Sequence, residues 1–152
     1  MSHSKIIKFI VVVGLLISTT TKANALTLSP ARIEITANPG DIYVGELSLI
    51  NEQEESKTFY TSFQNFESSG DTGAPNFIDT REGLSTWLSA ESQIVMGPKE
   101  EKTIEYTITV PMDARPGGHF AAIFMGTSPV EQTGSNDIAV GARVGALVLL
   151  RV

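Results

Sequence analysis

The sequence lacks cysteine, and it has little histidine and little charge. Without a single Cys in 152 residues, the chain has no disulfide, no thiolate metal site and no thiol nucleophile. His3 and His119 are its only histidines, which excludes His-based metal clusters and most catalytic triads. The 11 basic and 17 acidic residues give a net charge of −6, which argues against the concentrated basic face that nucleic-acid binding requires.

What the chain does have is apolar content and the length of one domain. Apolar residues make up 41% of the chain and charged residues only 18%, so a hydrophobic core can form and intrinsic disorder is excluded. Domains cluster near this length, and we therefore expect a single folded unit.

Residues 1–25 are predicted to be a secretory signal peptide. Lys5 and Lys8 precede an apolar run over residues 9–17, and Ala23-Asn24-Ala25 forms an A-x-A cleavage signal. The apolar run is far shorter than the ~20 residues that span a bilayer, which disfavours an uncleaved membrane anchor. We expect cleavage after Ala25 and an extracytoplasmic product that is periplasmic, at the cell surface or secreted.

Cleavage would make the remaining chain more acidic. It removes Lys5, Lys8 and Lys22 and no acid, so residues 26–152 keep 8 of the 11 basic residues against 17 acidic ones, a formal charge of −9. With no disulfide to support it, this exported domain must be held together by its core. At this size roughly two-thirds of the unfolded surface is buried on folding, which is sufficient.

Alternation of apolar and polar residues, punctuated by turns, predicts strands. The clearest case is Lys102–Val110, where apolar residues occupy every second position and indicate one buried and one exposed face. Pro30 interrupts the first segment, which indicates an edge strand or a strand with a switch point. The predicted strands are residues 26–37, 42–51, 57–66, 92–96, 102–110, 119–127 and 138–152.

These segments predict an all-β fold, a seven-stranded immunoglobulin-like antiparallel β-sandwich over residues 26–152. Long loops are expected over residues 67–79 and 128–137, and one helical turn within residues 80–90. A turn is predicted at Asn38-Pro39-Gly40-Asp41, where Pro suits a turn position and Gly is free to take positive φ.

No constellation for catalysis is found, and we expect neither an enzyme nor a cofactor. His119 lies where a turn enters a strand beside two glycines, which favours a structural or surface histidine. Asp71 and Asp79 flank a Gly-rich loop without the alternating acidic spacing of a dedicated calcium loop. Weak calcium binding by the 67–80 loop remains an open alternative.

Aromatic side chains supply the first candidates for partner binding. Phe59, Tyr60, Phe63 and Phe66 occupy both faces of one predicted strand, so part of that surface is either covered by the 67–80 loop or exposed as a binding patch. Trp87 stands between apolar neighbours and is expected in the core or a lid, with a role in ligand binding as the alternative. We therefore select Tyr60, Phe66 and Trp87 as candidate partner-binding residues.

The last predicted strand is apolar on both faces near its end. Either a neighbouring domain covers it or it is an interaction edge. The sequence stops at Arg151-Val152 within this strand, which suggests that residues 26–152 form the first domain of a longer protein.

Several short motifs, in order, resemble a known domain of bacterial surface proteins. They are Leu28–Glu34 followed by the 38–41 turn and Leu49-Ile50-Asn51, the V-P-x-x-A-x-P-G-x-H-F segment over residues 110–120, and Arg143–Leu149. Together they resemble the DUF916, or WxL-interacting protein, domain within the periplasmic-pilus-chaperone-like immunoglobulin group. That resemblance implies a binding or structural module of the cell envelope, whose partner is peptidoglycan or another surface protein. Such proteins continue into a second sandwich and a membrane helix, so membrane anchoring is expected only through a downstream region absent here.

The alternative is a chaperone-like assembly factor. Pilus-assembly chaperones place one basic residue on the first strand and one on the last, and both bind the terminal carboxylate of a client strand that pairs with the chaperone edge. Arg32 and Arg143 are similarly placed in this sequence. Surface charges that protect a strand edge are the simpler interpretation of both residues.

Overall fold

Two packed β-sheets make up the fold in a computed structural model that describes residues 25–69, 74–80, 82–129 and 143–152. Ten strands and one helical turn lie in these ranges. They are β1 (Leu26–Ser29), β2 (Arg32–Thr36), β3 (Ile42–Asn51), β4 (Lys57–Ser69), β5 (Ala74–Ile78), α2 (Leu84–Trp87), β6 (Leu88–Ala90), β7 (Gln93–Met96), β8 (Glu101–Thr109), β9 (Gly118–Gly126) and β10 (Arg143–Arg151).

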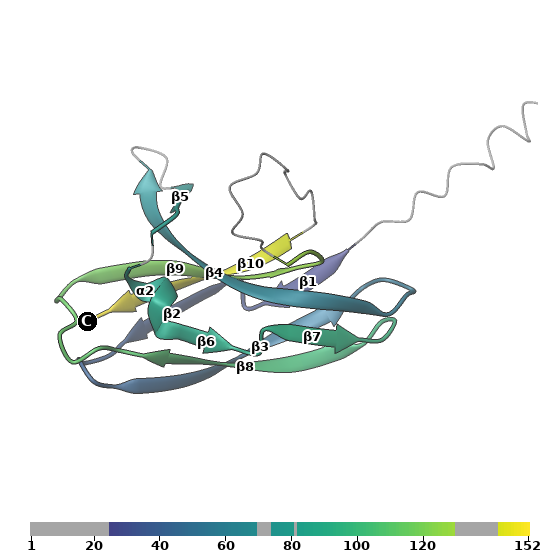
Figure 1. The fold of residues 1–152 in the computed structure, drawn as a ribbon, viewed down its shortest axis with the longest axis horizontal. Helices are drawn as coiled ribbons and strands as arrows, with labels where there is room; N and C mark the ends of the chain where they lie inside the picture. Colours follow the sequence, from purple (N-terminus) through teal and green to yellow (C-terminus); the bar gives the residue numbers. More distant parts are fainter. Residues whose placement is uncertain (1–24, 70–73, 81, 130–142) are drawn as a thin grey trace, which may run out of the picture.

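The first sheet has the order β1-β3-β8-β6, and the second has the order β2-β10-β9-β4-β5, with β7 also paired to β4. Figure 1 shows the sandwich with β5 and the end of β4 projecting from its body. The predicted all-β, immunoglobulin-like sandwich is confirmed. Within the described ranges, no helix combines the length and the apolarity needed to cross a membrane.

The core lies between the sheets and follows the predicted alternation. Ile104, Tyr106 and Ile108 of β8 are buried, as is Val110 just after it, while the residues between them point outward. Tyr106 needs space beside β3, and Gly45 supplies it, because a Cβ at that position would overlap the phenol ring. Burial raises the pKa of the Tyr106 hydroxyl well above its usual range, so it stays protonated.

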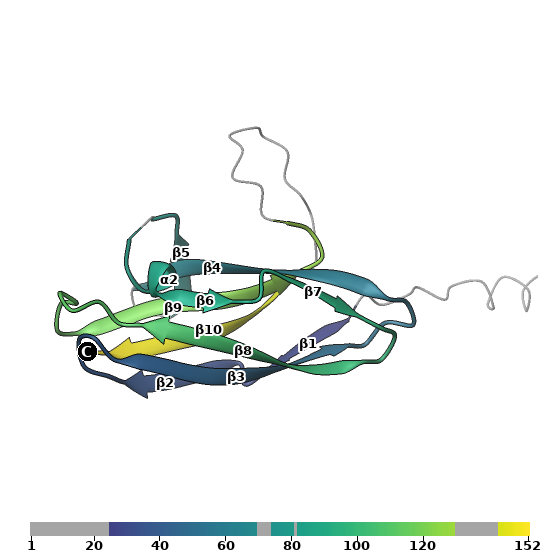
Figure 2. The same cartoon turned by 60° about the horizontal axis from the view of Figure 1, so that its bottom comes forward.

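The first predicted strand switches sheets at Pro30, which is one of the two alternatives that the interruption left open. β1 pairs with residues 48–51 of β3 in the first sheet, and β2 pairs with residues 147–151 of β10 in the second. The Ser29–Pro30 peptide bond between them is cis. Both views show β1 and β2 extending toward opposite ends of the molecule (Figures 1 and 2). Each therefore covers only one half of its neighbour.

Several features differ from the predicted sandwich. Its count of seven strands is not confirmed, since the described residues form ten, and the β2–β10 pair is parallel rather than antiparallel. Segment 74–78 was expected to be loop but pairs with β4 as β5. Pro75 and Asn76 weaken its strand signal, whereas the ladder to residues 65–69 stabilises the strand through contacts that the local sequence does not reveal.

Other predictions hold or lie outside the described residues. The helical turn expected within residues 80–90 is α2, and Gly40 has φ of 86° in the predicted turn. Four predicted parts lie outside the described residues. They are residues 1–24 of the predicted signal peptide, Asp71 of the 67–80 loop, residues 130–137 of the second expected loop and residues 138–142 of the last predicted strand.

Asn51 anchors the covered end of β3. Its buried amide donates to the carbonyl oxygens of Glu55 at 2.9 Å and Gly97 at 2.7 Å, and its side-chain oxygen accepts from the Gln53 N–H. In the adjoining turn, the Gly97 N–H donates to the Glu100 carboxylate at 2.5 Å. This hydrogen bond, together with Lys102 nearby, lowers the pKa of Glu100 below its ordinary value of 4.5.

Candidate functional site

The first half of β10 has a neighbour on one side only. β9 pairs with all of β10, but β2 begins its pairing at Leu147, whose N–H donates to the Ala31 carbonyl at 2.9 Å. Among the described residues, nothing pairs with Arg143–Ala146 on the side that β2 would occupy. We call this stretch the β10 half-edge.

The backbone groups of the β10 half-edge that face outward can be assigned from alternation. Leu147 N–H and Arg151 C=O bond toward β2, whereas Val152 exchanges both of its bonds with Gly117 on the β9 side. Successive residues alternate in direction, so the N–H and C=O groups of Arg143 and Gly145 point to the open side. An extended segment could pair with these groups and continue the sheet in line with β2.

Arg143 stands at the start of the half-edge and lies over an aromatic ring. Its guanidinium carbon is 4.3 Å from the centroid of Phe124, a cation–π arrangement. Gly145 makes room for this ring, because a Cβ there would lie 2.6 Å from Phe124 Cε1. The half-edge therefore presents a cation on an aromatic support next to open backbone.

Arg32 lies on the same outer face, but the structure does not bring it together with Arg143. Arg32 is opposite Leu147, four residues along β10 from Arg143, which is roughly 13 Å at about 3.3 Å per residue. Its guanidinium pairs with Glu34 at 2.7 Å, and both side chains are well exposed. The two arginines thus stand at the two ends of the open stretch and contact different neighbours.

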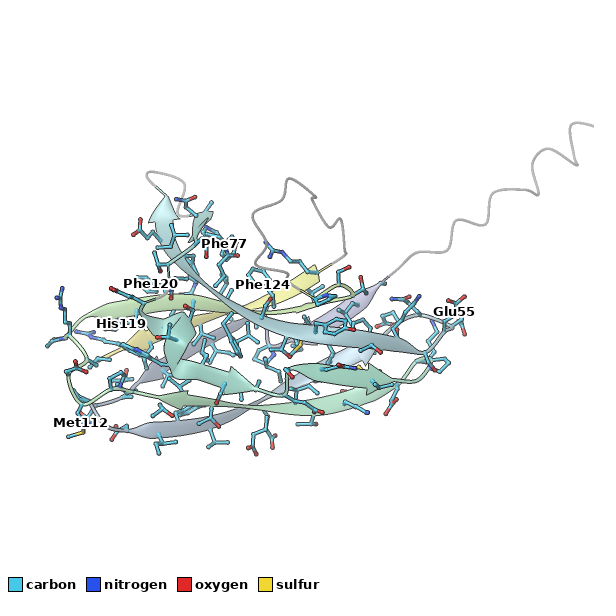
Figure 3. All side chains as sticks on the ribbon, viewed as in Figure 1. Glu55, Phe77, Met112, His119, Phe120 and Phe124 are labelled. Carbon is cyan, nitrogen blue, oxygen red and sulfur yellow. The ribbon has the colours of Figure 1, made fainter. Side chains whose placement is uncertain are left out.

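A cluster of phenylalanines covers the adjacent outer face of the second sheet. Phe66 is 5.9 Å from Phe77 and 5.7 Å from Phe120 between ring centroids, and Phe77 is 5.2 Å from Phe124. Figure 3 shows Phe77, Phe120 and Phe124 on the same side of the molecule, next to the β4–β5 hairpin. The hairpin thus covers Phe124, which is only 8% exposed, while Phe120 remains 37% exposed.

Asn65 holds the segment after this hairpin in place. Its amide donates to Thr80 Oγ1 at 2.9 Å and to the Glu82 carbonyl, and its oxygen accepts from the Ser85 N–H at 2.9 Å. Asn65 is itself 6% exposed, so these bonds are shielded from water. One side chain therefore ties β4 to the residues that lead from β5 into α2.

The predicted aromatic candidates lie in different places. Phe66 belongs to the phenylalanine cluster. Tyr60 is on the same face of β4 but lines an open groove of about 610 Å³ with Ser62, Asp79 and Thr80. Trp87 packs partly into the core and its ring centroid is 4.7 Å from that of His119, whose Nε2 is 2.8 Å from the Arg115 carbonyl oxygen. Trp87 thus has the structural contacts expected of a core or lid residue.

Sequence reasoning selected Phe66 and missed Phe77, Phe120 and Phe124. The last two share one parity in a strand that was predicted, so alternation could have placed them on one face. Phe77 offered no such signal, because its segment was expected to be loop.

The outer faces of the two sheets differ in charge. On the first sheet the charged residues that point outward from β3 and β8 are acids, namely Glu46, Glu101 and Glu105. On β2 and β10 of the second sheet the outward charges are Arg32, Arg143 and Arg151 together with Glu34. Nowhere in the described ranges do three His, Asp or Glu side chains gather as metal ligands would.

Comparison with known proteins identifies the fold. No family model and no curated protein matches this sequence. Among solved structures, the chain is similar to a PapD-like domain of human CEP192, with a TM-score of 0.57, 10% identity and 89% of each chain covered. It is also similar to a chain of the Salmonella enterica SafA pilin–SafB chaperone complex, with a TM-score of 0.55, 13% identity and coverage of 87% of this chain and 56% of the other.

A third similar structure is a family 123 glycoside hydrolase from Clostridium perfringens, with a TM-score of 0.57 and 9% identity, covering 84% of this chain and 27% of the hydrolase. The chain therefore spans about half of the chain matched in the chaperone complex and about a quarter of the hydrolase. The pilus-chaperone-like group expected from the sequence is confirmed at the level of fold, whereas membership of the DUF916 family stays a prediction. These similarities show that the chain has a PapD-like, immunoglobulin-type β-sandwich fold.

Proposed function

We propose that this chain is a non-enzymatic, extracytoplasmic binding module of the bacterial cell envelope, which holds an extended segment of a partner protein along the β10 half-edge. The open backbone of Arg143 and Gly145 is the observation that carries the proposal. A bound segment would complete the second sheet where β2 does not reach.

The side chains around the half-edge favour a particular kind of segment. Val144 and Ala146 point toward the core, so residues of the partner that face inward should be apolar. Arg143 and Arg32 lie on the outer face at the two ends of the open stretch, so residues that face outward should be acidic. The expected partner segment alternates apolar and acidic residues.

Three further observations support the proposal. The signal peptide predicted from the sequence would direct the chain out of the cytoplasm. The SafA–SafB structure to which the chain is similar is a complex of a chaperone with a pilin. The His119 ring contacts the Trp87 ring, and its Nε2 is within hydrogen-bond distance of the Arg115 carbonyl oxygen. These contacts favour a structural role for His119 over catalysis. A cell-wall polymer is the other partner considered from the sequence, but no described contact favours it over a protein.

The proposal is tested by titrating the purified protein with ten-residue peptides that alternate Val with Glu, followed by amide NMR. We expect shifts concentrated at residues 143–147. Arg143→Glu should weaken binding roughly tenfold, the magnitude expected when one close charge pair of about 1.4 kcal/mol is lost. Arg115→Glu, a charge reversal outside β10, is the matched control.

A second variant separates the backbone contribution from the charge. Arg143→Pro removes the N–H that faces the open side and leaves the ladder to β9 intact. It should weaken binding more than Arg143→Ala does. Shifts that map elsewhere, or retention by purified sacculi with no peptide binding, would contradict the proposal.

A further inference from the structure

The same strand switch opens a second edge, on β3. β1 pairs only with residues 48–51, so among the described residues Ile42–Leu47 have β8 on one side and nothing on the other. Asn51 N–H and Asp41 C=O bond toward β8, so alternation directs the N–H and C=O groups of Ile42, Val44 and Glu46 to the open side. We call Ile42–Leu47 the β3 half-edge.

Exposed apolar side chains concentrate at this half-edge. The described residues include six large hydrophobic side chains that are exposed, and four of them lie at this corner. They are Ile42 (69% exposed), Tyr43 (37%), Val44 (54%) and Met112 (83%), whose thioether packs against Gly40. Figure 3 shows Met112 at a corner of the sandwich away from the phenylalanine cluster.

The other strand edges carry features that discourage pairing. β2 presents the Arg32–Glu34 ion pair, β5 contains Pro75, and β1, β6 and β7 have only 3 or 4 residues each. Charges, prolines and short length are the devices by which proteins protect open edges. The β3 half-edge has no Lys, Arg or Pro, its one charge is Glu46 near its far end, and it exposes Ile42 and Val44, so it is less protected than the other edges.

We propose that the β3 half-edge is the interface of a symmetric dimer in which a second copy of this chain is the partner. A two-fold axis brings two identical edges together antiparallel, so any residue pair that forms is formed twice. When Tyr43 lies opposite Tyr43 of the partner copy, Ile42 faces Val44 in both directions. These two pairs exchange four backbone hydrogen bonds and bury apolar side chains against each other.

Charge and pattern select this register. It places Glu46 opposite Gly40 of the second copy, so no acid faces an acid directly. Shifting by one hydrogen-bonding step in one direction puts Ile42 against Glu46, and shifting in the other direction leaves Val44 opposite Gly40. Only the register centred on Tyr43 pairs both exposed apolar residues. It would join the first sheets of two molecules into one continuous sheet.

The contact is short, so the dimer should be weak. Stable interfaces bury about 1,200–2,000 Å² in total, and a six-residue edge lies at or below that range. We therefore expect a monomer–dimer equilibrium that depends on concentration. The interface is separate from the β10 half-edge and does not depend on the proposed function.

Sedimentation equilibrium of the purified protein tests this inference. The weight-average mass should rise toward twice the monomer mass with concentration, and Val44→Lys should hold it at the monomer value. Val95→Lys is the matched control, because Val95 is 58% exposed on β7 and lies outside the interface. A wild-type protein that stays monomeric at millimolar concentration, or two lysine variants that behave alike, would overturn the inference.

The register has its own test, because the chain contains no cysteine. Directly opposed residues in a non-hydrogen-bonded antiparallel pair have Cα atoms about 4.5 Å apart, within the range that a disulfide spans. Tyr43→Cys should therefore form a covalent dimer under mild oxidation, and Val95→Cys should not. Equal cross-linking of the two variants would exclude the register, even if the protein dimerises.

Discussion

The two half-edges have one structural origin, the switch of the first strand between sheets, and differ in the side chains that line them. When the first strand crosses between sheets at Pro30, it covers the second halves of β3 and β10 and leaves both first halves open. The β10 half-edge carries a cation that lies on Phe124, beside a ring cluster covered by the β4–β5 hairpin. The β3 half-edge exposes bare Ile42 and Val44. Both half-edges thus offer unpaired backbone groups, but the side chains around them differ. Those at the β10 half-edge are charged and select a partner, whereas those at the β3 half-edge are apolar and complementary to a second copy.

The largest expected effect contrasts the two faces of β3. Leu49 points into the core and is fully buried, whereas Ile42 points outward at the start of the open half. Leu49→Ala should lower the free energy of unfolding by about 3 kcal/mol, as expected for a cavity in a packed core. Ile42→Ala should change it by less than about 0.5 kcal/mol in dilute monomer. Urea unfolding measures both, and similar losses would mean that the Ile42 side chain is buried in the monomer.

Removing the hydrogen bonds of Asn65 should loosen the β4–β5 hairpin beside the β10 half-edge. The β10 half-edge would then be less covered and more like the bare β3 half-edge. Asn65→Ala deletes three shielded hydrogen bonds and leaves the Ser85 N–H without its acceptor. We expect a loss of about 2 kcal/mol in urea unfolding and faster hydrogen exchange in β5. Asn76→Ala, at an exposed position of β5, serves as the control. Unchanged exchange in β5 would show that the hairpin is held by its ring contacts alone.

A smaller change should disturb only the β10 half-edge. The Cβ of Gly145→Ala would overlap Phe124 and displace the ring on which Arg143 lies. We expect a loss of about 1 kcal/mol in stability and weaker peptide binding, with dimerisation through β3 unchanged. Arg143→Ala removes the charge without the overlap, so it should weaken binding and leave stability near wild type.

Salt should act on the two edges in opposite directions. Peptide binding at the β10 half-edge pairs arginines with acids and should weaken several-fold between 50 mM and 500 mM NaCl. Self-association at the β3 half-edge joins two net-acidic chains and should strengthen slightly over the same range. Titration calorimetry and sedimentation measure the two effects. If peptide affinity and self-association both rose or both fell with NaCl, one of the two sites would have been assigned the wrong chemistry.

The smallest effect concerns the turn at the covered end of β3. The pKa of Glu100 is lowered mainly by the Gly97 N–H, so its ionised form favours the folded state. This stabilisation is present above the ordinary pKa of 4.5 and is lost as the pH falls through the lowered folded value. Glu100→Gln should therefore flatten the decline in stability below pH 4.5 in acid unfolding, and an unchanged decline would contradict the assignment.

Much of the fold could be predicted because its signals are local. Alternation at residues 102–110 correctly assigned the buried face of β8. Pro30 marked either an edge strand or a switch point, and the switch is what the structure has. The candidate site was predicted only in part. Arg32, Arg143 and Phe66 were selected, but their true neighbours Glu34, Phe124 and Phe77 were not. The Arg143–Phe124 and Phe66–Phe77 contacts join different strands, and no spacing within a strand specifies them. Arg32 and Glu34 lie two residues apart in β2, where alternation could have placed them on one face.

The sequence by itself determined where strands and turns form, because side-chain alternation, glycine and proline act on the backbone within a few residues. Tertiary structure decided which half of each strand gains a neighbour, that β2 pairs parallel to β10, and that residues 74–78 form a strand. Pairing between strands depends on cross-strand contacts and on burial between sheets, which are properties of the assembled sandwich. The two open half-edges, and hence both proposed interfaces, exist only at that level.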